Sequence, residues 1–284
     1  MTISGVCLGT IDAYGLRVDE RGAGNILFTA SNSTLTGVGA DGVELDEGQN
    51  GIVRATVVGS AFNGNGGYCD PVLLSAELET FLAGTPDEAE FSEAEQVSSD
   101  SLPGPVVGSS DDRCFEFEVS TYESGFVEEY GYGIDTDDGF DIDEAGNGTI
   151  KTVIVDTQIN DNLDEGIDFD EEDAGGIDVV FFGTTASGNS DDGYKMSEQG
   201  VAGVIGIVGN ATATDNGGKG FVFEEEDDGN VTVFVANTET SNNDDSDDTG
   251  IEVVQEDEGS GRLTVTGSGI ADGNDLDGVE LVSE

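Results

Sequence analysis

Residues 138–148 read DGFDIDEAGNG, and residues 165–175 repeat the pattern as EGIDFDEEDAG, 27 residues further on. A glycine followed by two alternating apolar residues recurs at Gly15, Gly42, Gly139, Gly166, Gly193, Gly220, Gly250 and Gly278. Alternation of apolar and polar residues is typical of strands, and the glycines mark turns between them. A repeat of this length without a helical period predicts a solenoid.

The positions inside one unit, counted from its first glycine, show which side chains form the core. Mostly apolar residues fall at positions 2, 4, 12, 14, 16 and 21, which in one unit are Phe140, Ile142, Ile150, Thr152, Ile154 and Ile159, with Thr152 as the polar member. One unit is too small to enclose a core, so it must stack on its neighbours. The sequence therefore predicts an all-β protein, a right-handed parallel β-helix with coils of about 27 residues.

An asparagine column accompanies the repeat, at Asn65, Asn162, Asn189, Asn216, Asn243 and Asn274. Asparagine tolerates left-handed backbone angles, and stacked amides can bond to one another. We expect this column to form a structural ladder at one corner of the rod, without a chemical role.

One insertion interrupts the repeat and divides the chain into N-terminal coils (1–66), the insertion (67–132) and C-terminal coils (133–284). The insertion contains all four prolines, and its pattern predicts short acidic helices over 73–82 and 87–97, then strands over 114–119 and 121–130. Cys69 lies near the start of the insertion and Cys114 toward its end, so a disulfide between them would join the two ends of the insertion and would fit an extracellular protein. Cys7 has no predicted partner. Two roles remain open for the insertion, a binding surface and a spacer.

The charge of the chain excludes one class of partner. Lys and Arg number 8 against 62 Asp and Glu, which gives a net charge of −54, and there is no His. Nucleic acid is excluded because its binding requires basic side chains that replace counterions. Residues 1–10 do not form a signal peptide, and no later segment has the length and hydrophobicity of a membrane span, so no membrane insertion is predicted.

Part of the acid is periodic. Position 6 is Glu20, Glu47, Glu144, Glu171, Glu198 and Glu225, and positions 3 and 5 carry further acids. We expect these columns to face outward, with neighbouring carboxylates about 4.8 Å apart, where two charges repel by about 0.9 kcal/mol in water. Molar salt would screen this repulsion, and Ca²⁺ would bridge the carboxylates. Both alternatives, solvation of a halophilic protein and calcium binding, remain open.

The candidate calcium ligands come from the acid columns and from a partial match to a calcium loop near the C-terminus. In that match, Asp275, Asp277, Gly278 and Glu284 occupy loop positions 3, 5, 6 and 12. The predicted metal ligands are Asp141, Asp143, Glu144, Asp168, Asp170, Glu171, Asp275 and Asp277. No catalytic residue and no cofactor other than calcium is predicted.

The repeat units resemble the right-handed parallel β-helix repeat proteins, the superfamily with pectate-lyase-like folds. The resemblance rests on a unit that begins with DGFDIDEAGNG, ends at Asn162 and is followed by DEG at 164–166, where the next unit begins. The resemblance covers residues 15–65 and 133–284. It implies a polysaccharide lyase or glycoside hydrolase as an alternative function. Lyase-like members combine calcium-holding acids with a basic residue, whereas polygalacturonase-like members use clustered aspartates with a His and a basic pair, and this chain lacks a His. Its basic residues fall in different columns, at Arg54, Lys151, Lys195, Lys219 and Arg262.

These observations favour a non-enzymatic structural or adhesive segment of an extracellular or cell-surface protein. Its expected partners are a carbohydrate or another cell-surface molecule. The chain opens with strand-like residues at Ile3, Val6 and Leu8 and stops within a coil at Val279 and Leu281. Because solenoids need polar caps, we expect further β-helix coils of a longer chain on either side.

Overall fold

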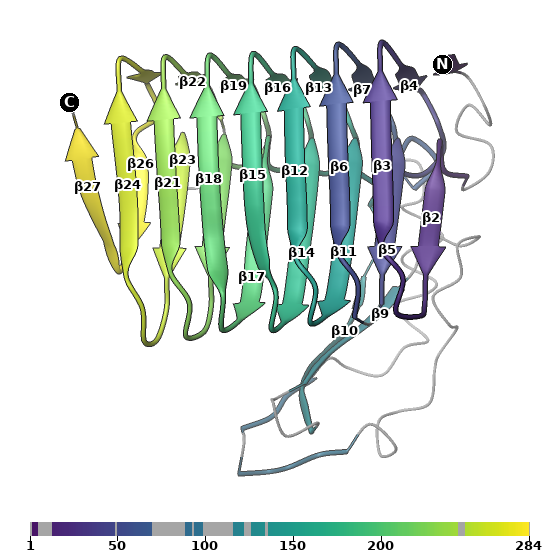
Figure 1. Cartoon of the computed structure of the whole chain (residues 1–284), viewed down its shortest axis with the longest axis vertical. Coiled ribbons are helices and arrows are strands. Elements are labelled where there is room, and N and C mark those ends of the chain that lie inside the picture. Colours follow the sequence, from purple (N-terminus) through teal and green to yellow (C-terminus); the bar gives the residue numbers. More distant parts are fainter. Residues whose placement is uncertain are drawn as a thin grey trace.

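The computed structural model describes residues 2–4, 13–48, 50–69, 89–92, 94–98, 116–121, 126–133, 136–243 and 248–283. Their strands form three parallel sheets of eight strands each and one antiparallel sheet of three strands. Figure 1 shows the parallel sheets as a rod of stacked coils, with the two termini at opposite ends. The predicted all-β parallel β-helix is confirmed.

Each coil gives one strand to each parallel sheet. The acidic sheet contains β2 (Arg17–Glu20), β5 (Val43–Glu47), β11 (Phe140–Gly146), β14 (Ile167–Asp173), β17 (Lys195–Gly200), β20 (Phe221–Glu225), β23 (Ile251–Gln255) and β26 (Asn274–Asp277). The valine-rich sheet contains β3 (Ile26–Ser31), β6 (Val53–Val58), β12 (Ile150–Val155), β15 (Gly176–Phe182), β18 (Gly203–Gly209), β21 (Val231–Ala236), β24 (Gly261–Thr266) and β27 (Val279–Ser283). The corner sheet contains β1 (Thr2–Ser4), β4 (Thr34–Thr36), β7 (Ala61–Asn63), β13 (Gln158–Asn160), β16 (Thr185–Ser187), β19 (Thr212–Thr214), β22 (Glu239–Ser241) and β25 (Gly269–Ile270).

The core lies between the three sheets and consists of the positions predicted to point inward. Strands pair in the register of the repeat, so that Phe140 lies beside Ile167 and Ile142 beside Phe169. In the unit that opens at Gly139, the six inward residues are at most 1% exposed. Gly206 stands at an inward position because a Cβ there would lie 2.5 Å from the ring of Phe223.

The asparagine column forms the predicted ladder at the corner that follows the corner sheet. Each side-chain amide donates to the Oδ1 of the next Asn, at 2.9 Å from Asn162 to Asn189 and 3.1 Å from Asn189 to Asn216. The left-handed backbone angle belongs to the residue before the Asn, as at Asp161 (φ 56°). The prediction for Asn274 is wrong: this residue lies in β26, and Asp272 accepts the bond from Asn243.

The insertion forms a small antiparallel sheet that projects from the side of the rod (Figure 1). Its strands are β8 (Ala89–Glu90), β9 (Glu116–Thr121) and β10 (Val127–Gly133), in the order β8-β10-β9. The predicted helix over 87–97 is wrong in its described part, because Ala89 and Val97 pair with β10. The predicted helix over 73–82 lies outside the described residues.

Cys69 is buried and disulfide-bonded at the start of the insertion. Cys7 and Cys114 both lie outside the described residues. The pairing of Cys69 with Cys114 therefore stays a prediction.

A charge on the inward side of a strand tests the register. Val233 in β21 is 1% exposed, whereas its neighbour Thr232 points to solvent. Val233→Asp should lower the free energy of unfolding by several kcal/mol, since it buries an unpaired charge, and Thr232→Asp should change it by about 0.5 kcal/mol or less. Urea unfolding followed by circular dichroism measures both values. Equal effects at the two sites would contradict the register.

Candidate functional site: the acidic sheet

The outward face of the acidic sheet presents two rows of mostly acidic side chains, at positions 3 and 5 of successive units. Equivalent residues lie side by side in the register, about 4.8 Å apart. Position 3 carries Arg17, Glu44, Asp141, Asp168, Lys195, Val222, Glu252 and Asp275, and position 5 carries Asp19, Asp46, Asp143, Asp170, Ser197, Glu224, Val254 and Asp277. The two rows thus hold eleven acidic and two basic residues.

One cluster in these rows joins β5 to β11. Glu44, Asp46 and Asp141 each place a carboxylate oxygen within 4.8 Å of the others. Arg17 pairs with Glu44 through Nε and with Asp46 through Nη2, both at 3.2 Å. The remaining oxygens, Glu44 Oε2 and Asp46 Oδ1, are buried without a hydrogen-bond partner. Burial, together with the charges of Asp41 and Asp46, raises the pKa of Glu44 to about 9.

A second cluster joins the next pair of coils. Carboxylate oxygens of Asp138, Glu165 and Asp168 lie within 4.8 Å of one another, and Glu165 also meets Asp164 and Asp191 in a third group. Lys195 Nζ lies 2.7 Å from Asp168 Oδ2 and 3.7 Å from Glu165 Oε1. Asp168 Oδ1 is buried without a hydrogen-bond partner. Each cluster therefore combines one basic side chain with carboxylate oxygens that this side chain does not reach.

The predicted metal ligands divide into three sets. Asp141 and Asp168 lie in the two clusters. Asp143 and Asp170 lie beside them and line a groove of about 470 Å³ with Lys195 and Glu224. Asp275 and Asp277 are exposed on β26 and belong to none of the clusters found among the described residues.

The third set, Glu144 and Glu171, contradicts the expected outward orientation. The position-6 side chains from Glu47 to Glu225 are at most 1% exposed and form a buried column, here named the glutamate ladder: Glu47, Glu144, Glu171, Glu198 and Glu225, followed by Gln255 at 8%. The reason is parity, because position 6 follows the inward positions 2 and 4 on an alternating strand. The side chain turns into the bend that leads to the valine-rich sheet, where Glu225 accepts from the backbone N–H of Gly229 at 2.7 Å.

The glutamate ladder stacks carboxyl groups that have little else to bond to. Among the described residues, no side chain other than a neighbouring carboxyl donates to Glu144, Glu171 or Glu198, although the backbone N–H groups of Gly148, Ala202 and Gly203 favour the ionised forms of Glu144 and Glu198. Burial and the neighbouring carboxyls of Glu144 and Glu198 raise the pKa of Glu171 to about 10. Burial also raises the pKa values of Glu144 and Glu198 to about 7 each. A protonated Glu171 can donate to a neighbour, as Gln255 donates its amide N–H to Glu225.

The sequence prediction missed a further acid column, which supplies Asp138 and Glu165 to the second cluster. These residues stand immediately before the corner glycine of their units, as do Asp41 and Asp192. Glu165 donates its backbone N–H to Asp138 Oδ1 at 2.7 Å, so the column is also tied from coil to coil. In the sequence, the column is visible as an acid that recurs immediately before the corner glycine. Its closeness to the position-3 acids follows only from the folded structure.

No protein-family model matches this chain, and no significant match is found among curated proteins or solved structures. In the part of the chain that the structure describes, no helix has the length and apolar character needed to cross a bilayer. The geometry of the described residues is therefore the basis for the function proposed below.

The glutamate ladder predicts a loss of stability as pH rises. Glu171 holds its proton more tightly in the folded state, with a pKa of about 10, than at its ordinary value of 4.5. The folded state therefore binds more protons between these values, and its stability falls as pH rises through them. At pH 9, Glu171→Gln should raise the free energy of unfolding by about 1–3 kcal/mol, because the amide is a permanent donor, whereas folded wild type must hold a proton that the unfolded chain has released.

Urea unfolding at pH 5 and pH 9 measures this effect. Glu172→Gln is the matched control, because Glu172 is exposed and adjacent on β14. The Glu171 variant should lose part of the pH dependence, and the control should keep it. A Glu171 variant that is less stable than the wild type at pH 9 would contradict the interpretation that Glu171 is protonated and donates to a neighbouring carboxylate.

Proposed function

We propose that this chain is a non-enzymatic β-helical segment of an extracellular or cell-surface protein, with a structural or adhesive role, and that Ca²⁺ clamps its coils together across the acidic sheet. The observation that carries the proposal is the pair of carboxylate clusters between adjacent coils. Glu44 and Asp46 come from β5 and Asp141 from β11, so one cation would contact two coils.

The oxygen chemistry of the clusters suits calcium. Ca²⁺ takes six to eight oxygen ligands in flexible geometry, and carboxylates serve it with one or two oxygens. Glu44 and Asp46 are at most 8% exposed, and each has one buried oxygen without a hydrogen-bond partner. A cation there would offset the repulsion between neighbouring carboxylates, which is larger in a partly buried site than in water. An adhesive role would use the stiffened rod to present its insertion to a carbohydrate or another cell-surface partner.

The alternative function, a polysaccharide lyase or glycoside hydrolase, draws support from Lys195 in the acidic groove. A lyase base must give up its proton near neutral pH. Burial alone would lower the pKa of Lys195, but the charges of Asp168, Asp170 and Glu165 outweigh burial and raise it. Lys195 is therefore suited to neutralise the acid rows, as is Lys219, whose Nζ lies 2.6 Å from Glu252. We favour the structural role for this reason.

Thermal melting followed by circular dichroism tests the calcium clamp. The buffers are low salt with chelator, low salt with millimolar Ca²⁺, and molar KCl with chelator. A ligand present at 100 times its Kd stabilises the folded state by about 2.7 kcal/mol, so we expect Ca²⁺ to raise Tm by several degrees above the chelator sample.

The double variant Glu44→Gln/Asp141→Asn should lose most of this calcium-dependent rise. Asp275→Asn is the control, because Asp275 occupies the same row but is exposed and outside the clusters. The clamp would be contradicted if molar KCl raised Tm while millimolar Ca²⁺ raised it no more than its ionic strength explains. In that case the acid rows would serve to solvate the protein in high salt.

A further inference from the structure

The outward face of the valine-rich sheet differs in charge from the acidic sheet. Its strands present three rows of side chains in register. In the described strands, the charged members of these rows are three basic and two acidic residues: Arg54, Lys151, Arg262, Asp178 and Glu280. The face is thus near neutral, whereas the acidic sheet carries eleven acids against two basic residues.

The centre of this face is apolar and exposed. Among the described residues, ten large apolar side chains are exposed, and seven of them belong to this face. Phe182, Ile205, Ile207 and Phe234 are between 42% and 50% exposed. They lie on β15, β18 and β21, next to Val153 on β12. Monomeric proteins seldom expose a contiguous apolar patch of this kind unless it binds something.

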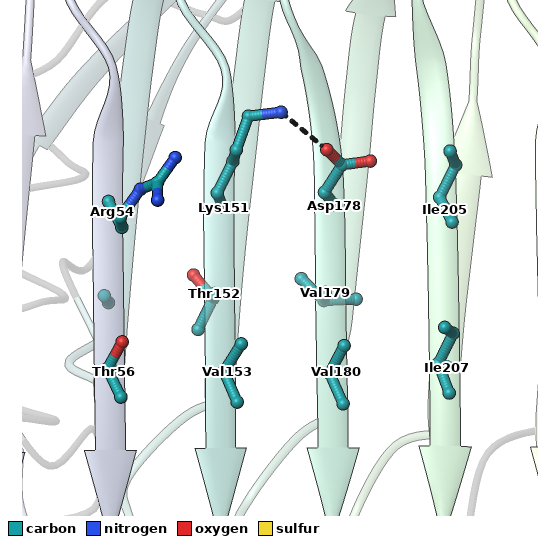
Figure 2. A pocket seen from close by; sticks show the side chains of 11 residues that line it. Arg54, Thr56, Lys151, Thr152, Val153, Asp178, Val179, Val180, Ile205 and Ile207 are labelled. Atoms are coloured by element: carbon teal, nitrogen blue, oxygen red, sulfur yellow. Dashed lines mark hydrogen bonds and ion pairs between the residues drawn. The ribbon is translucent and has the colours of Figure 1, made fainter.

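Figure 2 shows the part of the face that is hollowed, a groove of about 350 Å³ across β6, β12, β15 and β18. One row runs from Arg54 through Lys151 and Asp178 to Ile205, and Lys151 Nζ lies 2.7 Å from Asp178 Oδ2. The row below it contains Val153, Val180 and Ile207 (Figure 2). The ion pair neutralises the charges of Lys151 and Asp178 beside the apolar row, so Arg54 carries the one net charge among the residues that line the groove.

We propose that this face packs against the same face of a second copy of the chain. A face that is apolar and near neutral is complementary to a copy of itself, because neither side presents a row of like charges to the other. A second copy carries a net charge of −54, but only two of its acidic residues lie in the described rows of this face, so two copies can meet here with few like charges between them. Apolar sheets of two molecules pack face to face about 10 Å apart, as in a β-sandwich.

The area of the face is sufficient for a stable dimer. Eight strands at about 4.8 Å spacing, each about 20 Å long, give a footprint of about 700–800 Å². A standard protein interface buries about 800 Å² on each partner. Because the two copies repel one another at long range, salt that screens their charges should strengthen the dimer.

Sedimentation velocity of the full chain at micromolar concentration, in low salt and in molar KCl, tests the proposal. The wild type should sediment as a dimer in KCl and dissociate partly in low salt. The double variant Val153→Glu/Ile207→Glu should weaken the dimer at least tenfold, which corresponds to about 1.4 kcal/mol. Val201→Glu is the matched control, because Val201 is 62% exposed in the turn before β18, away from this face.

Circular dichroism and urea unfolding of the three proteins show that the variants keep the fold, as expected for side chains already exposed. A wild type that stays monomeric in both buffers would overturn the proposal and leave the face to another partner. A double variant that dimerises as tightly as the wild type would also overturn it. The outcome does not depend on calcium, because every sample contains chelator.

Discussion

Each residue of this rod lies one strand spacing, about 4.8 Å, from the equivalent residue of the next coil, so every side chain must be compatible with a similar one above and below it. Apolar side chains meet this condition by packing, as Tyr194 does against Phe221, the equivalent residue of the next coil, with stacked rings whose centroids lie 4.4 Å apart. Amides meet it because each carries both a donor and an acceptor, and the asparagine ladder continues through four direct Asn–Asn bonds. Ionised carboxylates only accept, so their columns need a proton or a cation.

The two acidic features of the molecule answer this requirement differently. Inside the rod, the raised pKa of Glu171 keeps a proton available between Glu144 and Glu198. On the acidic sheet, Arg17 and Lys195 neutralise part of the clusters, and we propose that calcium completes them. The valine-rich sheet carries few acids, and there the proposed partner is a second copy. One repeat thus produces a buried ladder and two outer faces, for which we propose separate roles.

The fold could be predicted from the sequence because the alternation and the 27-residue register are local patterns that stacking turns directly into sheets. The same alternation predicts that position 6 points inward. The prediction of an outward column failed because a row of charged residues is usually exposed to solvent, whereas here the alternation of the strand determines the direction of the side chain. Asp138 and Glu165 could not be assigned to a cluster from the sequence because the cluster joins Asp138 of one coil with Glu165 and Asp168 of the next. The helix predicted near Ala89 failed since pairing with β10 decided its structure.

Infrared spectroscopy of the folded protein at neutral pH tests most directly whether coil stacking forces the glutamate ladder to hold protons. A protonated carboxyl absorbs separately from a carboxylate, and glutamates at their ordinary pKa of about 4.3 would be ionised at this pH. We predict a carboxylic-acid band in the folded protein that disappears on unfolding and is weaker in Glu171→Gln. A folded protein without this band, or a band unchanged in the variant, would contradict the account.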